Sequence, residues 1–202
     1  MSLLLNRSYF GNEANKGNTL SKQEAENLFN EWVINSRLKL HMKQVAQLMK
    51  HWAAEKENLN EADQWRWEMA GLLHDADWDQ WPDQHCKKII EELESRNVDP
   101  EIIHAIASHG LLYFGVEPVT TMDKMLFAFD ELSGLIHAYS LMRPNGYDGM
   151  DVKGVKKRLK EKSFAANVSR EDINDACSRA GIELDELIAF IIPRQSTVLQ
   201  DQ

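Results

Sequence analysis

The chain has 202 residues, of which 43% are apolar and 27% charged, and its formal net charge is −9. This length and composition are typical of one folded domain or two small ones, and such a chain can bury a core without disulfide bonds or structural metals. The negative charge disfavours binding to the phosphate backbone of bulk nucleic acid. Cys86 and Cys177 form no CxxC pair, which excludes a thiolate zinc site and a disulfide framework.

The sequence contains no signal-peptide core and no apolar stretch long enough to span a bilayer. We therefore expect a cytoplasmic protein that does not insert into a membrane. Residues 1–20 are expected to form an N-terminal extension and residues 21–150 a helical domain. Residues 151–202 are expected to add C-terminal helices packed on the same domain.

Apolar residues recur every three or four positions after residue 20, and this spacing predicts an all-α chain. Ser21 followed by Glu24 is a capping-box pattern, which predicts a helix over residues 21–34. A second helix is expected over residues 36–55. His41 lies on the apolar side of this second helix, so we expect its imidazole to point inward.

The third helix is expected over residues 60–74 and ends in the acidic turn HDADWD, which spans residues 74–79. The next helix is expected over residues 82–96, with a proline in its first turn. A shorter helix over residues 100–108 follows, and Gly110 lies just beyond its end.

A long apolar helix with a threonine cap is expected over residues 120–141. Residues 143–149 have the composition of a loop. The remainder, over residues 151–192, predicts two or three shorter helices, one of them capped by Ser169.

Four side chains form an ordered set of nitrogen and oxygen donors on three predicted helices. His41 lies on the second helix, His74 and Asp75 end the third, and Asp130 lies in the long apolar helix. Helical bundles build metal sites from facing helices in this way. A single buried histidine is more often part of a core, and a His-Asp dipeptide is common by chance, so the prediction depends on the order and placement of all four residues.

Asp130 directly follows the apolar run Met125–Phe129. An unpaired carboxylate is costly to bury, so Asp130 needs a cation, a hydrogen-bond network or an exposed face. Ser133 and Gly134 on the next turn leave room for an ion, a water molecule or a substrate. The alternative is that Asp130 and Glu131 lie on a solvated strip of an amphipathic helix.

The ordered pattern His, His-Asp, Asp resembles that of the HD superfamily of metal-dependent phosphohydrolases, through His41, His74, Asp75 and Asp130. The resemblance covers residues 35–142, and the segments GLLHDADWDQWPDQH, IIHAIASHG and FAFDELSGLI are similar to an uncharacterised bacterial branch of HD hydrolases. It implies an all-α, HD-domain-like helical bundle in which these four side chains hold one divalent ion.

Some HD enzymes hold a second ion through additional histidines between the His-Asp pair and the last aspartate. His85 and His109 are the better candidates in this interval for a second metal or for substrate, and His104 is weaker because its helical register differs from that of His109. One and two ions remain alternatives. A nitrogen and oxygen donor set suits Mn²⁺, Fe²⁺, Co²⁺, Ni²⁺, Mg²⁺ or Zn²⁺.

The resemblance implies hydrolysis of a phosphate ester, in a nucleotide or another small phosphomonoester or phosphodiester, by metal-activated water. Asp77 and Asp79 are candidate general acids or bases, with capping or solvation of the turn as the alternative. HD phosphatases often place an acidic residue three positions after the His-Asp aspartate, where this chain has Trp78.

Five basic residues are candidates for binding the phosphate group: Arg143, Lys153, Lys156, Lys157 and Lys160. The alternative is that the lysine run is a solvated helix face.

Two other functions remain open. The first is a di-iron HD-type oxygenase, in which His85 and His109 complete the ligand set. The second is a non-catalytic helical sensor or interaction module. The expected partner is a small phosphorylated substrate, with no membrane and no bulk nucleic acid, and the sequence sets no oligomeric state.

Overall fold

The computed structural model describes residues 17–111 and 115–198, and within these ranges the chain is all-α apart from one isolated bridge between Asn18 and Val98. The expected extension over residues 1–20 lies largely outside the described residues. The helices are α1 (Lys22–Trp32), α2 (Ser36–Glu55), α3 (Glu61–Leu73), the 3-10 turn η4 (Pro82–Gln84), α4 (Lys87–Ser95), α5 (Pro100–His109), α7 (Thr121–Met142), α8 (Val152–Lys160), α9 (Arg170–Ala180) and α10 (Leu184–Gln195).

Capping side chains begin several helices at the predicted places. Ser21 forms a capping box with Glu24 at the start of α1, and Thr120 forms one with Asp123 at the start of α7. Ser169 caps α9 by accepting a hydrogen bond from a main-chain N–H of its first turn. These side chains satisfy N–H groups that have no partner within the helix, so the local sequence sets where each helix begins.

The expected continuous helix over residues 82–96 is wrong, because the chain breaks at His85 and Cys86 between η4 and α4. Cys86 has a φ of 64°, outside the helical region. The Asp77 carboxylate accepts hydrogen bonds from the N–H groups of Cys86 and Ile89, at 3.3 and 3.0 Å. A side chain from an earlier turn thus caps α4, and the break orients His85.

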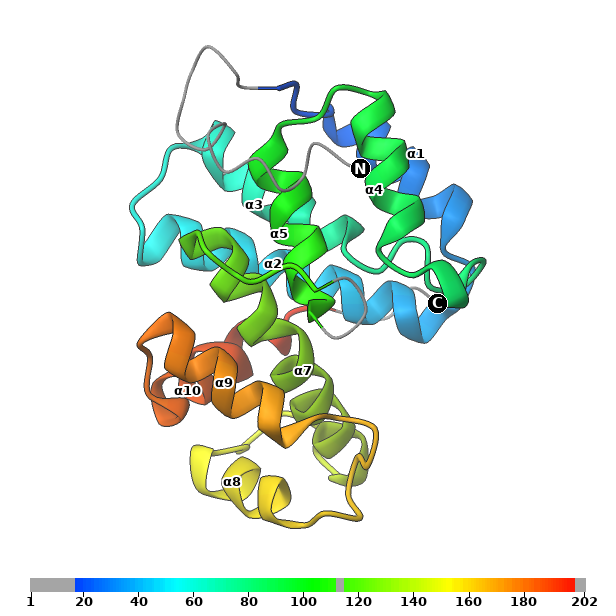
Figure 1. Ribbon diagram of the computed structural model, residues 1–202. Helices are drawn as coiled ribbons and strands as arrows, with labels where there is room; N and C mark the ends of the chain where they lie inside the picture. The colour runs from blue at the N-terminus through cyan, green and yellow to red at the C-terminus, as the bar shows by residue number, and fades with distance from the viewer. Residues whose placement is uncertain (1–16, 112–114, 199–202) are drawn as a thin grey trace.

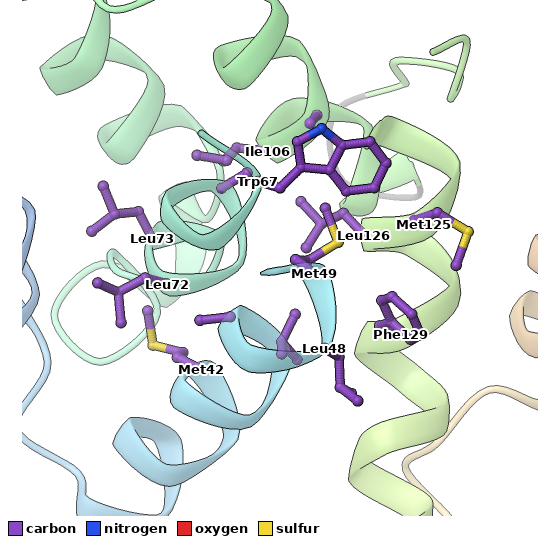
Figure 2. Close-up of a cluster of buried hydrophobic side chains, with 14 of the residues drawn as sticks. Met42, Leu48, Met49, Trp67, Leu72, Leu73, Ile106, Met125, Leu126 and Phe129 are labelled. Atoms are coloured by element: carbon purple, nitrogen blue, oxygen red, sulfur yellow. The ribbon is translucent and has the colours of Figure 1, made fainter. Parts of the chain in front are cut away.

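The core lies where α2, α3 and α7 pack together. Figure 2 shows Met42 and Met49 of α2 facing Leu72 of α3 and Leu126 of α7. The α2 and α3 backbones approach so closely at Gly71 that an added Cβ there would lie 2.8 Å from a main-chain atom of α2. This close approach sets the separation between the two helices that carry the first two predicted metal ligands.

The C-terminal helices share this core. Figure 1 shows α7 running from the group of α3 and α5 into the group of α8, α9 and α10. The buried side chain of Gln195, in α10, donates hydrogen bonds of 2.9 Å to the Gln44 side chain in α2 and to the Ser133 carbonyl in α7. Residues 151–198 therefore pack directly on the helices that precede them.

None of the helices in the described part of the chain combines the length and the apolar character needed to cross a bilayer.

Candidate metal centre

Three helices bring the four predicted ligands to one place. His41 comes from α2, His74 from the C-cap of α3, Asp75 from the residue that follows, and Asp130 from α7. One donor atom from each lies within 4.8 Å of the others. His41 Nε2 is 2.9 Å from Asp130 Oδ1, and His74 Nε2 is 3.5 Å from the same oxygen. Asp130 thus faces the cluster with an exposed side-chain fraction of 21%, and it does not lie on a solvated strip.

His74 provides the test of whether these residues fit a metal ion. Its side chain is 0% exposed, and its Nδ1 donates a 2.7 Å hydrogen bond to the Gly71 carbonyl. This bond leaves Nε2 aimed toward the carboxylates of Asp75 and Asp130, and Nε2 has no hydrogen-bond partner. Buried polar atoms in folded proteins are nearly always satisfied, and an imidazole fixed through Nδ1 is the usual arrangement of a metal ligand. The donor set therefore fits a divalent ion.

The electrostatics of the cluster favour a cation. Burial lowers the pKa of His74, but the neighbouring Asp75 and Asp130 carboxylates outweigh burial and raise it to about 9. Burial opposes ionisation of Asp130, yet contact with His41 and His74 holds the pKa of this carboxyl well below its ordinary value. Two ionised carboxylates in a largely buried site require compensating positive charge, which an ion with several oxygen and nitrogen ligands supplies.

Two further histidines lie beside Asp75, on the side of its Oδ1 atom. His85 Nε2 and His109 Nε2 lie 3.4 and 3.3 Å from Asp75 Oδ1, while Asp75 Oδ2 faces His74. Each of these two histidines is fixed through Nδ1, which donates to Asp77 in one case and to a main-chain carbonyl of α5 in the other. The structure thus places both candidate second-site histidines beside the first cluster, with Asp75 between the two sets.

Asp77 and Asp79 occupy positions that call for a revision of their expected acid or base role. Asp77 is 0% exposed, and its carboxylate is held by His85 and by the start of α4. Asp79 accepts hydrogen bonds from the N–H groups of Ile34 and Asn35, at the junction of α1 and α2. Neither carboxylate lines the cleft described below. Their geometry instead supports a positioning role for Asp77 and a capping role for Asp79.

The expected phosphate-binding residues also lie elsewhere. Arg143 donates a 2.7 Å hydrogen bond to the Gly146 carbonyl. The lysines line a separate hollow beside α8: Lys153, Lys156, Lys157 and Lys160. Lys156 is paired with Asp185 at 2.6 Å. Because none of these cations lines the metal cleft, the expectation that they contact the phosphate is revised.

The cluster opens into a cleft of about 540 Å³. Its lining includes Trp78, together with Phe127 and Glu131 of α7, and Asn167 and Asp172 from the segment before α9 and its first turn. Sequence reasoning did not find Asn167 or Asp172, because both reach the cleft only through the tertiary packing of α9 and the segment before it. Trp78, three residues after Asp75, thus lines the cleft with an aromatic ring.

Glu131 lies next to Asp130 and borders the cleft. Burial, followed by the neighbouring Asp130 charge, raises the pKa of Glu131 to about 7. One of its carboxylate oxygens accepts a 3.1 Å hydrogen bond from the Ser169 main-chain N–H. Glu131 thus connects α7 to the start of α9 at the edge of the cleft.

Cys86 is a further buried donor that the sequence did not suggest. It groups with His85 and His109 within 4.8 Å. Burial, with nearby Asp77 and Asp75 charges, raises the pKa of the thiol above its ordinary range. A Cβ added at Gly110 would lie 2.5 Å from the Cys86 sulfur. Glycine at this position, at the end of α5, leaves room for the thiol.

Residues 40–135 match the family model described as the HD domain, and this range contains all six histidine and aspartate side chains of the two donor sets. Neither the curated proteins nor the solved structures contain a match to the chain.

Proposed function

From the membership of this chain in the HD superfamily of metal-dependent phosphohydrolases, through its HD domain at residues 40–135, we propose that it is a metal-dependent hydrolase of phosphate esters. The observation that carries the proposal is the unpartnered Nε2 of fully buried His74, which faces two ionised carboxylates. The substrate is a small phosphomonoester or phosphodiester that enters the cleft of about 540 Å³.

The first ion is held by His41, His74, Asp75 and Asp130. A divalent ion, when bound, supplies a water molecule of lowered pKa and offsets negative charge on the attacked phosphate. Mn²⁺, Fe²⁺, Co²⁺, Ni²⁺, Mg²⁺ and Zn²⁺ all accept this donor set. The chain's own contribution is to fix the donors before the substrate arrives, because the Gly71 carbonyl holds the tautomer and orientation of the His74 ring.

His85 and His109, whose Nε2 atoms lie 3.4 and 3.3 Å from Asp75 Oδ1, would hold a second ion. Asp77 fixes the ring of His85 from behind, at 2.9 Å, so that Nε2 is presented to the Asp75 oxygen. This arrangement gives the proposed enzyme two adjacent cation positions along one side of the cleft.

Metal analysis and phosphatase assays test the proposal. We expect purified wild-type protein to contain at least one equivalent of a divalent metal and to hydrolyse p-nitrophenyl phosphate or bis(p-nitrophenyl) phosphate after loading with one of the six ions. His74→Ala is expected to lose both the bound metal and the activity. The matched control is His51→Ala, because His51 is a partly exposed histidine on α2 that pairs with Glu55, and this variant is expected to keep both.

A protein that binds no ion, and whose thermal stability is the same in wild type and His74→Ala with or without Mn²⁺, contradicts the proposal. Such a result supports a non-catalytic sensor or interaction module instead.

The nitrogen-rich second set also favours one alternative chemistry, a di-iron oxygenase. Iron content, oxygen consumption and a mixed-valence spectroscopic signal identify that activity. Phosphate release by a redox-silent Mn²⁺ or Mg²⁺ preparation identifies the hydrolase.

A further inference from the structure

We propose that Cys86 is a sulfur ligand of the second ion, beside His85 and His109, and that this position therefore selects a thiophilic ion, Zn²⁺ before Mn²⁺ or Mg²⁺. The inference deepens the proposed function and rests on it. It adds a donor type that the histidines and aspartates of the first cluster do not provide. Soft thiolate ligands favour zinc, whereas carboxylate and water ligands suit magnesium and manganese.

Three donors of the zinc type lie together in the interior. One donor atom from each of His85, Cys86 and His109 lies within 4.8 Å of the others, and the exposed fractions of these residues are 7%, 0% and 7%. Donors around a tetrahedral zinc ion with nitrogen and sulfur ligands are about 3.5 Å apart, so small side-chain rotations bring this set onto one ion. The lack of a CxxC pair excludes a site with neighbouring thiolates, but it leaves open a site with one thiolate and two imidazoles.

One carboxylate oxygen holds two of these donor residues. Asp77 Oδ1 accepts a hydrogen bond from His85 Nδ1 at 2.9 Å and another from the Cys86 N–H at 3.3 Å. The first bond leaves His85 Nε2 facing Asp75 Oδ1, at 3.4 Å. The second holds the main chain of Cys86 at the break before α4. A buried group that orients adjacent ligands in this way is a usual part of a metal site.

Gly110 keeps open the space beside the sulfur. A Cβ added there would lie 2.5 Å from Cys86 Sγ and 3.9 Å from His85 Nε2. The φ of Gly110 is −88°, outside the left-handed region that favours glycine, so the backbone conformation does not account for the missing side chain. Gly110 lines the cleft, and the fully buried Cys86 lies behind it. The space that the glycine leaves therefore connects the cleft with the sulfur and the imidazole.

Metal binding through Cys86 exchanges a proton for the ion. The S–H bond breaks, a metal–sulfur bond forms through the sulfur electron pair, and the proton passes to solvent. In the metal-free protein the thiol donates to the Ile106 carbonyl at 4.0 Å, a long contact of a weak donor, so little is lost when the proton leaves.

Cobalt spectroscopy tests the sulfur ligand directly. The full-length protein, freed of metal with EDTA, is titrated with Co²⁺, because a bond between Co²⁺ and a thiolate produces a charge-transfer band in the near ultraviolet. We expect the wild-type protein to develop this band and Cys86→Ser to lose it while still binding Co²⁺ at the first position. Cys177→Ser is the matched control, because Cys177 lies on α9 and does not line the cleft, and it is expected to keep the band.

Competition with a chromophoric chelator measures the selectivity of the second position. We expect Cys86→Ser to weaken Zn²⁺ binding there by at least about tenfold, since a direct ligand contributes no less than the outer groups that orient ligands. Mn²⁺ binding is expected to change less, because the serine hydroxyl replaces a soft donor with an oxygen.

A wild-type protein that binds Co²⁺ without the band overturns the inference and leaves the proposed function intact. A band that survives in Cys86→Ser, or an equal loss of Zn²⁺ and Mn²⁺ affinity in this variant, does the same. If Cys86→Ser does not fold, Cys86→Gly replaces it, because glycine adopts the φ of 64° readily and also removes the sulfur. A wild-type protein that binds neither Co²⁺ nor any of the other five ions overturns the proposed function together with the inference.

Discussion

Asp77 is a buried carboxylate that orients a proposed metal ligand and does not itself line the cleft. It accepts one hydrogen bond from the His85 ring and two from main-chain N–H groups at the start of α4. All of its contacts therefore orient other groups, and none faces the cleft. Residues that orient a ligand in this way usually change metal affinity about 10- to 100-fold when they are replaced.

We predict that Asp77→Asn weakens binding of the second ion by about 10- to 100-fold and leaves the first ion bound. The carboxylate accepts hydrogen bonds through both oxygens, from the His85 ring and Cys86 N–H and from Ile89 N–H. The asparagine amide has only one oxygen acceptor, so it cannot hold the His85 ring and both main-chain N–H groups in the same way. Titration calorimetry with Mn²⁺ and elemental analysis after dialysis measure the two sites. Asp83→Asn, on the exposed surface of η4, serves as the control. Equal affinities of both sites in Asp77→Asn and wild type contradict the positioning role.

The raised pKa of His74 predicts how the metal-free protein responds to pH. Its pKa is raised from 6.5 to about 9 in the folded state, so this histidine binds a proton more tightly when folded than when unfolded. The resulting stabilisation is fully present below pH 6.5 and is lost as the pH rises through 9, by an amount on the order of 3 kcal/mol.

Urea unfolding in EDTA at pH 6.5 and pH 9 measures this loss, and the same measurement with Mn²⁺ provides the comparison. We expect bound Mn²⁺ to remove much of the decrease, because the ion replaces the proton on the His74 ring. Metal-free stability that stays constant or increases across this range contradicts the assignment.

At the scale of helices, Gly71 controls how closely α3 approaches α2. A Cβ at this position would meet main-chain atoms of Ala46 at 2.8 and 2.9 Å, and main-chain atoms cannot move aside as a flexible side chain can. The two helices position His41 and His74, so the same contact controls the separation of two proposed metal ligands.

We predict that Gly71→Ala lowers the free energy of unfolding by about 1–3 kcal/mol, because overpacking outweighs the gain in helix propensity. Gly134→Ala is the matched substitution within α7, where an added Cβ meets nothing within 4 Å. There we expect a stability change between zero and a gain of about 1 kcal/mol. Chemical denaturation of both variants measures the difference, and a stabilised Gly71→Ala protein contradicts the packing explanation.

The helices show what local sequence determines. The cap residues Ser21, Thr120 and Ser169 lie within the segments that they begin, so the sequence predicts those boundaries correctly. The break before α4 was missed, because its cap is the Asp77 carboxylate from an earlier turn. The order of the four residues and the family resemblance predict that His41, His74, Asp75 and Asp130 meet, and the structure brings them together. Asp172 was not predicted, because only the packing of α9 on α7 brings it to the cleft.

At the scale of the whole molecule, the C-terminal helices share one hydrophobic core with the helices that precede them. Trp52 of α2 lies edge-on to Phe190 of α10, with ring centroids 4.9 Å apart, and Gln195 of α10 is bonded to Gln44 of α2. Side chains of α8, α9 and α10 belong to the same buried cluster as those of α2, α3 and α7. Unfolding of the C-terminal helices would therefore remove buried contacts from α2, α3 and α7 and destabilise them.

The distribution of tryptophan allows this coupling to be measured. All six tryptophans lie within residues 32–81, so their fluorescence reports the first half of the chain, whereas far-UV circular dichroism reports every helix. We expect the two signals to give coincident urea transitions. Leu187→Ala, in the buried face of α10, is expected to lower both midpoints together and to cost about 2–5 kcal/mol. A fluorescence midpoint that stays at the wild-type value while the circular dichroism transition splits in two would show that residues 151–198 unfold independently.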